Sequence, residues 1–270
     1  MHRKVHARFG GGRGETGHRR GAPRLPYKTT TTVNLAACLV ELGRRVLVVD
    51  VDPQGNSTSG LGLDKRKVDQ CIYDVLVGEV PVERVVRMTA FPGLDIVPAT
   101  LDLAGAEIEL VPVMARETKL RKALESIVDK YEFILIDCPP SLGLLTINAL
   151  TAAKSIIVPI QCEYYALEGL GQLMSTIKLV QSHLNPGLVL EGVVLTMFDG
   201  RTNLAIQVVE EVKRFFRGKV YGTVVPRNVR LSEAPSHGKP VIAYDPRSRG
   251  AEIYRELARE VVEHAKESAG

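Results

Sequence analysis

The chain has 270 residues, of which 45% are hydrophobic and 24% are charged, and its formal net charge is +4. This length and composition are typical of a soluble globular protein with one large α/β domain or two small ones. No apolar run approaches the ~20 residues of a membrane span and no signal-peptide core lies near the start, so we expect a cytoplasmic protein that does not use a membrane.

The positive charge is concentrated at the start of the chain. Residues 1–27 hold seven of the 35 Lys and Arg residues and one of the 31 Asp and Glu residues, which leaves 28 bases and 30 acids in residues 28–270. The body of the chain is therefore near neutral. Global charge alone is a weak indication of binding to nucleic acid.

The cysteines suggest no metal site. Cys38, Cys71, Cys138 and Cys162 show no CxxC spacing, which argues against zinc or iron–sulfur ligation. An iron–sulfur relative of nitrogenase reductase is disfavoured for the same reason. We expect reduced thiols, as is usual for a cytoplasmic protein.

Residues 1–27 show little apolar periodicity. The segment 5–9 alternates weakly, and Gly12, Gly14 and Gly17 match the GxGxxG pattern only literally, because no convincing buried strand precedes them and no apolar helix follows. We expect a disordered or aberrant basic tail rich in Gly and Arg, followed by a single domain over residues 28–270. The abrupt change of composition at Lys28 leads to the hypothesis of a frameshift or misassigned start in the coding sequence.

The rest of the chain alternates between helices and strands. Apolar spacing predicts a helix over 30–42, and four consecutive apolar residues at 46–49 predict a strand buried on both faces, as in a parallel sheet. Further strands are predicted at 94–99, 133–136, 155–160, 188–197, 223–226 and 241–244. Further helices are predicted at 72–76, 82–86, 101–110, 117–130, 167–182, 204–216 and 251–265. This order indicates an α/β fold with a doubly wound, mostly parallel sheet and helices on both faces.

The start of the first predicted helix, Lys28-Thr29-Thr30, has the chemistry of a phosphate site. A lysine can reach the β- and γ-phosphates, the hydroxyl after it can bind Mg²⁺, and the helix N-terminus offers free N–H groups to the anion. These residues correspond to the second half of a phosphate-binding loop (P-loop). The first half is missing, because residues 23–27 read Pro-Arg-Leu-Pro-Tyr instead of containing glycines.

Two aspartates follow buried strands. Asp137 ends the strand at 133–136, in the place of a Walker B aspartate that holds Mg²⁺ through water or the Thr29 hydroxyl. Asp52 follows the strand at 46–49 and could position or polarise an attacking water. A single aspartate at a strand end is more often a helix cap or turn former, but two of them beside a Lys-Thr helix start favour a site for ATP and Mg²⁺.

Three motifs stand in order along the chain: VVDVDPQGN at 48–56, IDCPPS at 136–141 and PRNVRLSEAP at 226–235. Together they resemble the ParA/Soj family of chromosome- and plasmid-partitioning ATPases, a deviant-Walker class of P-loop proteins. The resemblance runs from about Lys28 to the C-terminus, and it implies a P-loop NTPase fold that hydrolyses ATP to ADP and phosphate.

The resemblance also implies roles for individual residues. Lys28 is expected to be a catalytic and ATP-binding residue, and Asp52 to be the catalytic residue that orients the hydrolytic water. The Mg²⁺ site is expected to comprise Thr29, Asp137 and Asp52. The remaining ATP contacts are expected from Thr29, Thr30, Met197, Pro226 and Asn228.

Partners follow from the same resemblance. It implies a homodimer that sandwiches ATP, binds DNA without sequence preference on the nucleoid, and releases it when a ParB-like centromere-binding protein triggers hydrolysis. The C-terminal third is locally basic, which suits phosphate contacts, although Glu210, Glu211 and Glu233 offset part of that charge. The expected DNA-binding residues are Arg201, Lys213, Arg214, Arg217, Arg227 and Arg230.

The chain departs from the family's KGGVGKTT loop. The signature lysine falls on Pro23 and the loop glycines on Arg24, Leu25 and Tyr27, and the family's central apolar first strand is expected to be absent. One alternative is therefore a hydrolysis-deficient pseudo-ATPase that binds DNA or a partner. Another is a MinD-like division-site ATPase, which the lack of an aromatic, basic amphipathic C-terminal helix disfavours.

Overall fold

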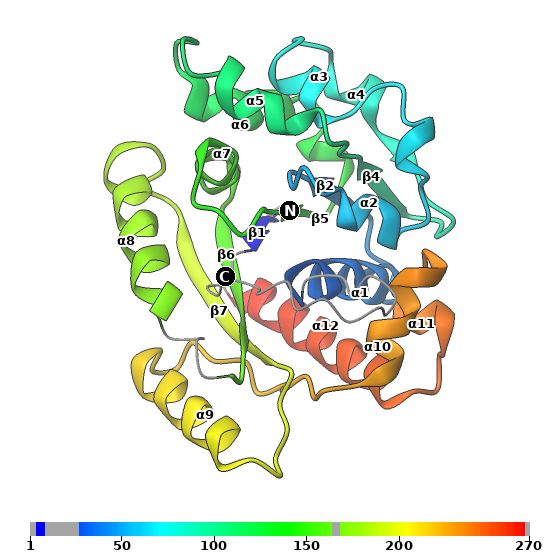
Figure 1. Ribbon diagram of the computed structural model, residues 1–270, viewed down its shortest axis with the longest axis vertical. Coiled ribbons are helices and arrows are strands. Elements are labelled where there is room, and N and C mark those ends of the chain that lie inside the picture. Colours follow the sequence, from blue (N-terminus) through cyan, green and yellow to red (C-terminus); the bar gives the residue numbers. More distant parts are fainter. Residues whose placement is uncertain (1–3, 9–26, 164–167, 268–270) are drawn as a thin grey trace.

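The computed structural model describes residues 4–8, 27–163 and 168–267. The strands form one seven-stranded sheet in the order β3-β4-β2-β5-β1-β6-β7 (Figure 1). Every neighbouring pair is parallel except β3 and β4, so the predicted doubly wound, mostly parallel sheet is confirmed. The strands are β1 Lys4–Arg8, β2 Val46–Asp50, β3 Arg87–Met88, β4 Leu94–Val97, β5 Phe133–Asp137, β6 Ser155–Gln161 and β7 Val189–Thr196.

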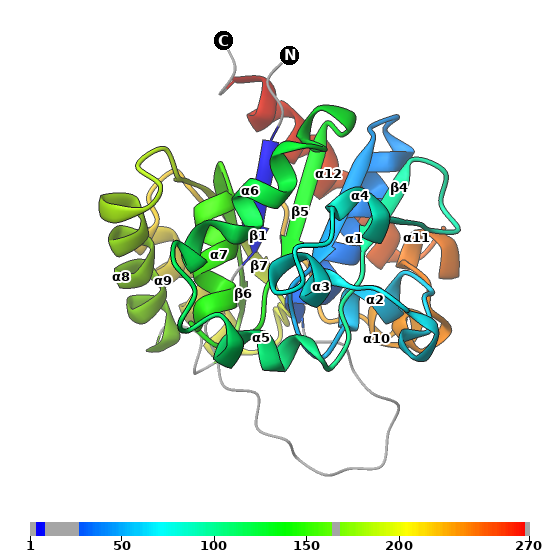
Figure 2. The same ribbon diagram turned by 90° about the horizontal axis from the view of Figure 1, so that it is seen from above.

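Helices cover both faces of this sheet. Helices α3 to α9 pack into one hydrophobic cluster, whereas α1, α10, α11 and α12 pack into the other, on the opposite face. Figure 2 shows α5, α6 and α7 in front of the sheet and α12 behind it. The bounds are α1 Tyr27–Glu41, α2 Asn56–Gly60, α3 Ile72–Leu76, α4 Val82–Val85, α5 Leu103–Glu109, α6 Lys119–Glu125, α7 Leu144–Ala152, α8 Glu168–His183, α9 Asn203–Phe215, α10 Val229–Glu233, α11 Val241–Tyr244 and α12 Arg249–Glu267.

Strand β2 shows why its sequence has no polar alternation. Leu47 and Val49 belong to the first cluster, and Val46 and Val48 belong to the second. Because successive side chains point to opposite faces, a strand that is covered on both sides needs apolar residues at every position. Each such side chain contributes roughly 1.5–3 kcal/mol when it is fully buried.

The N-terminal strand corrects one expectation. Strand β1 (Lys4–Arg8) lies at the centre of the sheet, paired with β5 over its whole length and with β6 over His6–Arg8, so the prediction that the family's central first strand is absent is wrong. The predicted disordered tail is also wrong for these five residues. A central strand is held by backbone hydrogen bonds on both sides, which do not depend on side-chain identity. The GxGxxG match at Gly12, Gly14 and Gly17 lies outside the described residues.

Two predicted strands near the C-terminus are also wrong. Residues 241–244 form helix α11, which begins after Pro240, and the Val241 N–H donates to Asn34 Oδ1 at 2.6 Å. Residues 223–226 lie outside the strands of the sheet: Pro226 makes an isolated bridge to Phe198, and Val225 donates its N–H to the Leu195 carbonyl and accepts the Phe198 N–H. In both places a short apolar run with β-branched residues does not distinguish a strand from other buried segments.

Helix α12 anchors α1 against the sheet. Tyr254 on α12 hydrogen-bonds to Thr31 on α1 through their hydroxyls at 3.2 Å, and the Arg255 guanidinium forms an ion pair with Glu41 at 2.6 Å. These contacts fix α1 at both ends of its length, so its first turn has a defined place at the edge of the sheet. Within the described ranges, no helix combines the length and apolar character that crossing a membrane requires.

Candidate active site

The carboxyl ends of β2 and β5 bring the predicted aspartates together. Asp50 and Asp137, the last residues of these two strands, pair in register, and Asp52 follows two residues later. Asp50 and Asp137 are fully buried and Asp52 is 4% exposed. The edge of the sheet where open α/β folds bind ligands therefore holds three carboxyl groups in close proximity.

Asp137 is surrounded by hydroxyl groups. The Thr32 hydroxyl donates to its Oδ1 at 3.2 Å, the Ser57 hydroxyl donates to its Oδ2 at 2.7 Å, and the Thr29 side chain also hydrogen-bonds to it. Burial raises the pKa of Asp137, and these hydroxyl groups oppose that shift. The predicted pair of Thr29 and Asp137 is thus brought together.

Lys28 lies in the first turn of α1 and is 5% exposed. Burial lowers its pKa, whereas Cys138, Asp137 and Asp52 raise it. Because the Lys28 side chain is buried, little water screens its ammonium group. A phosphate that enters the site would therefore interact strongly with it. Thr30 is in the same turn, and its carbonyl accepts a hydrogen bond from the Asn34 amide at 2.7 Å.

Asp52 keeps part of its carboxylate available. Its Oδ1 accepts the Gln54 N–H at 2.9 Å, and the described residues donate no hydrogen bond to its Oδ2. Burial raises the pKa of Asp52, and the Gln54 N–H and the ammonium of Lys28 oppose that shift. One oxygen is therefore fixed and the other can accept a hydrogen bond from a water molecule.

The donors at this edge fit Mg²⁺ and a phosphate. Thr29 and Asp137 offer oxygen ligands, which a hard cation prefers, and Lys28 adds a positive charge at the start of a helix. The described residues contain no group of three or more His, Cys, Asp or Glu side chains that could hold a metal ion. Mg²⁺ commonly uses one or two protein ligands together with water and substrate phosphates. We therefore expect this site to bind Mg²⁺ when a nucleotide supplies the remaining ligands.

Of the three residues predicted near adenine, Met197 comes directly after β7, which β1 and β6 separate from β5, whereas Pro226 and Asn228 come just before α10. Met197 follows β7 with a φ of 55°, a left-handed conformation that is unusual for a residue other than glycine. Pro226 bridges to Phe198, and Asn228 Oδ1 accepts the N–H groups of Arg230 and Leu231 at the start of α10. Their role in binding adenine stays a prediction.

The six basic residues expected to bind DNA fall into two groups. Three form ion pairs, which are Arg201 with Asp199, Arg227 with Glu163, and Arg230 with Glu233 and Asp245. The other three lie at or just after the end of α9 and form no ion pair with any described residue; they are Lys213, Arg214 and Arg217. All six side chains stand at the surface.

The sequence analysis assigned no role in the site to four residues that the structure places there, namely Thr32, Asp50, Ser57 and Thr58. Thr32 and Ser57 donate to Asp137, and Asp50 accepts two hydrogen bonds from Thr58. The sequence contained one indication of Thr32. It belongs to the run of threonines at 29–32, and it lies one helical turn after Lys28, on the same face of the helix. Ser57 and Thr58 gave no such signal, because their approach to the aspartates depends on how the chain turns after β2.

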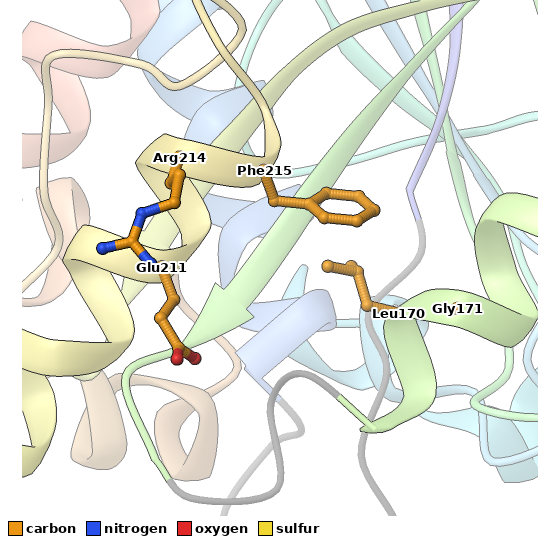
Figure 3. Close-up of a pocket in the computed structure, with 5 residues that line it drawn as sticks. All are labelled: Leu170, Gly171, Glu211, Arg214 and Phe215. Carbon is orange, nitrogen blue, oxygen red and sulfur yellow. The ribbon is translucent and has the colours of Figure 1, made fainter.

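A separate hollow of about 470 Å³ lies between α8 and α9, lined by Leu170, Gly171, Glu211, Arg214 and Phe215. Figure 3 shows the Phe215 ring facing Leu170 across it, with Glu211 and Arg214 on the α9 side. Phe215 is 62% exposed. This hollow lies beside the opposite half of the sheet from β2, and none of the predicted ATP or Mg²⁺ residues lines it.

Comparison with known proteins decides the family. A family model described as an AAA domain matches residues 27–190, which is more than half of the chain. The sporulation initiation inhibitor protein Soj of Bacillus subtilis is 65% identical over 234 residues, which cover 87% of this chain and 92% of that protein. The chain belongs to the Soj/ParA family of chromosome-partitioning ATPases.

Solved structures agree with the predicted P-loop NTPase fold. A cobyrinic acid a,c-diamide synthase from Mycobacterium smegmatis, with bound ADP and magnesium, is 37% identical with a TM-score of 0.80, over 98% of this chain and 96% of that one. The MinD protein of Pyrococcus horikoshii, complexed with Mg-ADP, is 29% identical with a TM-score of 0.74, over 96% of each chain. The far higher identity to Soj favours the Soj/ParA family over the MinD-like alternative.

The buried aspartates should make the folded protein less stable as pH rises, the opposite of the usual effect of aspartates in ion pairs. Burial, with Asp137 adding to it, raises the pKa of Asp50 to about 8, and burial also raises the pKa values of Asp137 and Asp52. Between about pH 4 and pH 8 the native state then binds more protons than the unfolded state, so stability falls as pH rises through this window. We expect the melting temperature without nucleotide or Mg²⁺ to fall from pH 5.5 to pH 8.

The control for this prediction is Asp50→Asn, which removes one of the titrating groups. Its melting temperature should depend less on pH than that of the wild-type chain over the same range. Thermal unfolding followed by circular dichroism at each pH measures both. A wild-type melting temperature that rises towards pH 8 with the same slope in both proteins would contradict the prediction.

Proposed function

We propose that this protein is an ATP-dependent DNA segregation protein. Two copies sandwich ATP, the dimer binds DNA of any sequence on the nucleoid in the cytoplasm, and a ParB-like centromere-binding protein stimulates hydrolysis and release. The observation that carries the proposal is the cluster of Lys28, Thr29, Asp52 and Asp137 at one edge of the sheet in a chain of the Soj/ParA family.

Each residue of this cluster has a separate task in the proposed hydrolysis. Lys28 binds the β- and γ-phosphates and offsets negative charge that develops on them. Thr29 and Asp137 would hold Mg²⁺, which neutralises phosphate charge when it is bound. Asp52, with one oxygen fixed by the Gln54 N–H, orients a water molecule towards the γ-phosphate through its other oxygen. Met197, Pro226 and Asn228 would contact the adenine.

The test of this function is ATP turnover by the full chain. We expect turnover to require Mg²⁺, to rise when DNA and a ParB-like protein are both added, and to accompany release of DNA. Phosphate release and DNA binding are measured on the same sample. Absence of turnover together with retained DNA binding would instead support the pseudo-ATPase alternative, which the missing glycines before Lys28 favour.

Basic side chains on the surface are expected to contact DNA phosphates. Two triple substitutions to alanine should each weaken DNA binding in the presence of ATP, because each removes three positive charges that can contact phosphates. Each lost contact also reduces the slope of log K against log salt concentration by about 0.9. If all three residues of a set contact phosphates, their replacement should reduce the magnitude of that slope by about 2.7. The two sets are Arg201, Arg227 and Arg230, and Lys213, Arg214 and Arg217.

A matched control changes the net charge by the same amount elsewhere. Arg84, Lys122 and Lys130 are exposed basic residues outside both sets, and alanine at these three positions should leave the salt slope unchanged. Fluorescence anisotropy with a labelled DNA duplex over a range of salt concentrations gives the slope. An equal loss of affinity in the control and in both sets would show a general charge effect and would contradict a defined surface.

A further inference from the structure

We infer that Asp50 is a positioning residue of the active site, which holds Asp52 in place through the backbone of residues 52–58. The inference rests on the proposed role of Asp52 in hydrolysis. Asp50 was not assigned a function by its motif. Its contacts distinguish it from the two aspartates beside it.

The carboxylate of Asp50 binds two points of the chain that follows it. Its Oδ1 accepts the N–H of Asp52 at 3.2 Å, and its Oδ2 accepts the N–H and the hydroxyl of Thr58, each at 2.8 Å. Asp50 and Thr58 are both fully buried. The turn that carries Asp52 is thus held at its first residue and again in helix α2 (Asn56–Gly60).

Thr58 extends this network to a third strand. While its hydroxyl donates to Asp50, the same oxygen accepts the N–H of Ala99, just after β4, at 2.9 Å. The turn also lies against this segment at Gly55, where a side-chain carbon would come within 2.7 Å of the Ala99 carbonyl oxygen. The ends of β2 and β4 and the start of α2 are therefore locked together around Asp52.

Asp50 and Asp52 differ in what their oxygens can do. Both oxygens of Asp50 accept hydrogen bonds from its own chain, in a site without exposure to solvent. Only Oδ1 of Asp52 accepts a hydrogen bond from the described residues. Three donors on one fully buried carboxyl group fix its orientation and tie it to both Asp52 and Thr58, so Asp50 is an effective clamp for this turn. The structure therefore assigns positioning to Asp50 and contact with water to Asp52.

The test uses substitutions that remove the clamp with little change in volume. Asp50→Asn replaces one acceptor oxygen with an N–H₂ group, and Thr58→Val removes the hydroxyl that joins Asp50 to Ala99. We expect each to lower kcat by roughly 10–100-fold, as small misplacements of a catalytic group do, with KM for ATP within about 3-fold of the wild type. Thr58→Ser keeps the hydroxyl and should restore kcat to within about 3-fold of the wild-type value.

Amide hydrogen exchange tests the clamp without relying on turnover. In the full chain, Asp50→Asn should speed exchange at the Asp52 and Thr58 amides, because both N–H groups donate to Asp50. The control is Asp64→Asn, which alters an aspartate that caps the short helix Lys65–Lys67 and should change neither kcat nor these two amides. Unchanged exchange at both amides, or a rise in KM that accounts for the loss of kcat/KM, would overturn the inference.

The two readouts separate this inference from the function on which it rests. If the wild-type chain hydrolyses no ATP, the proposed function fails, and exchange at Asp52 and Thr58 alone decides whether Asp50 holds this turn. If the wild type hydrolyses ATP and Asp50→Asn turns over at the wild-type rate, the function stands and the positioning role is wrong.

Discussion

Asp52→Ala is expected to lower the rate constant of ATP turnover by about 10²–10⁴-fold, the range associated with loss of a positioned acid–base group. The side chain is 4% exposed, one of its oxygens is fixed by the Gln54 N–H, and Lys28 is close enough to lower its pKa. Alanine removes the Oδ2 that is proposed to accept a hydrogen bond from the attacking water. Phosphate release under saturating ATP and Mg²⁺ measures the effect.

The affinity of this variant for ATP separates catalysis from binding. Because Lys28, Thr29 and Asp137 remain, the dissociation constant for ATP should stay within about 3-fold of the wild-type value. Asp69→Ala, which removes an exposed carboxylate without a resolved role, is the control and should turn over at the wild-type rate. Turnover by Asp52→Ala at more than half of the wild-type rate would show that water is oriented by another group.

The sequence predicted those parts of the fold and site that repeat a short pattern. Runs of apolar residues such as 46–49 and 133–136 mark strands that are covered on both faces, and polar residues directly after them mark the binding edge. Asp52, Asp137 and Thr29 could therefore be placed at one edge before the structure was known. The structure confirms their proximity, while their roles in ATP hydrolysis stay predictions.

Features that depend on pairing between distant segments were not predictable in this way. Residues 4–8 form a central strand although they are basic and only weakly alternating, because hydrogen bonds from β5 and β6 hold their backbone. Residues 241–244 form a helix because a proline begins it and Asn34, 207 positions earlier, accepts the Val241 N–H. In the same way, the clamp from Asp50 to Thr58 and Ala99 joins three segments, and no single window of sequence contains it.

Restoring the family loop before Lys28 should raise the affinity for ATP. We expect the dissociation constant for ATP to fall by about 10²–10⁴-fold, which corresponds to two or three charge-assisted hydrogen bonds at ~1.5–3 kcal/mol each, with part of the gain spent on ordering the loop. Isothermal titration calorimetry with ATP and Mg²⁺ measures it. The restoring substitutions are Pro23→Lys, Arg24→Gly, Leu25→Gly, Pro26→Val and Tyr27→Gly.

The physical reason for this gain is the backbone rather than the added charge. Glycines let bare N–H groups approach the phosphates, and replacing Pro26 returns an N–H that proline lacks. Pro23→Lys alone adds the signature charge without the cradle, so it should give less than about one tenth of the full improvement in affinity. The hydrogen bond between Thr31 on α1 and Tyr254 on α12 involves none of the substituted residues. If the wild-type chain already binds ATP as tightly as the restored one, residues 23–27 do not limit binding, and the pseudo-ATPase alternative loses its only support.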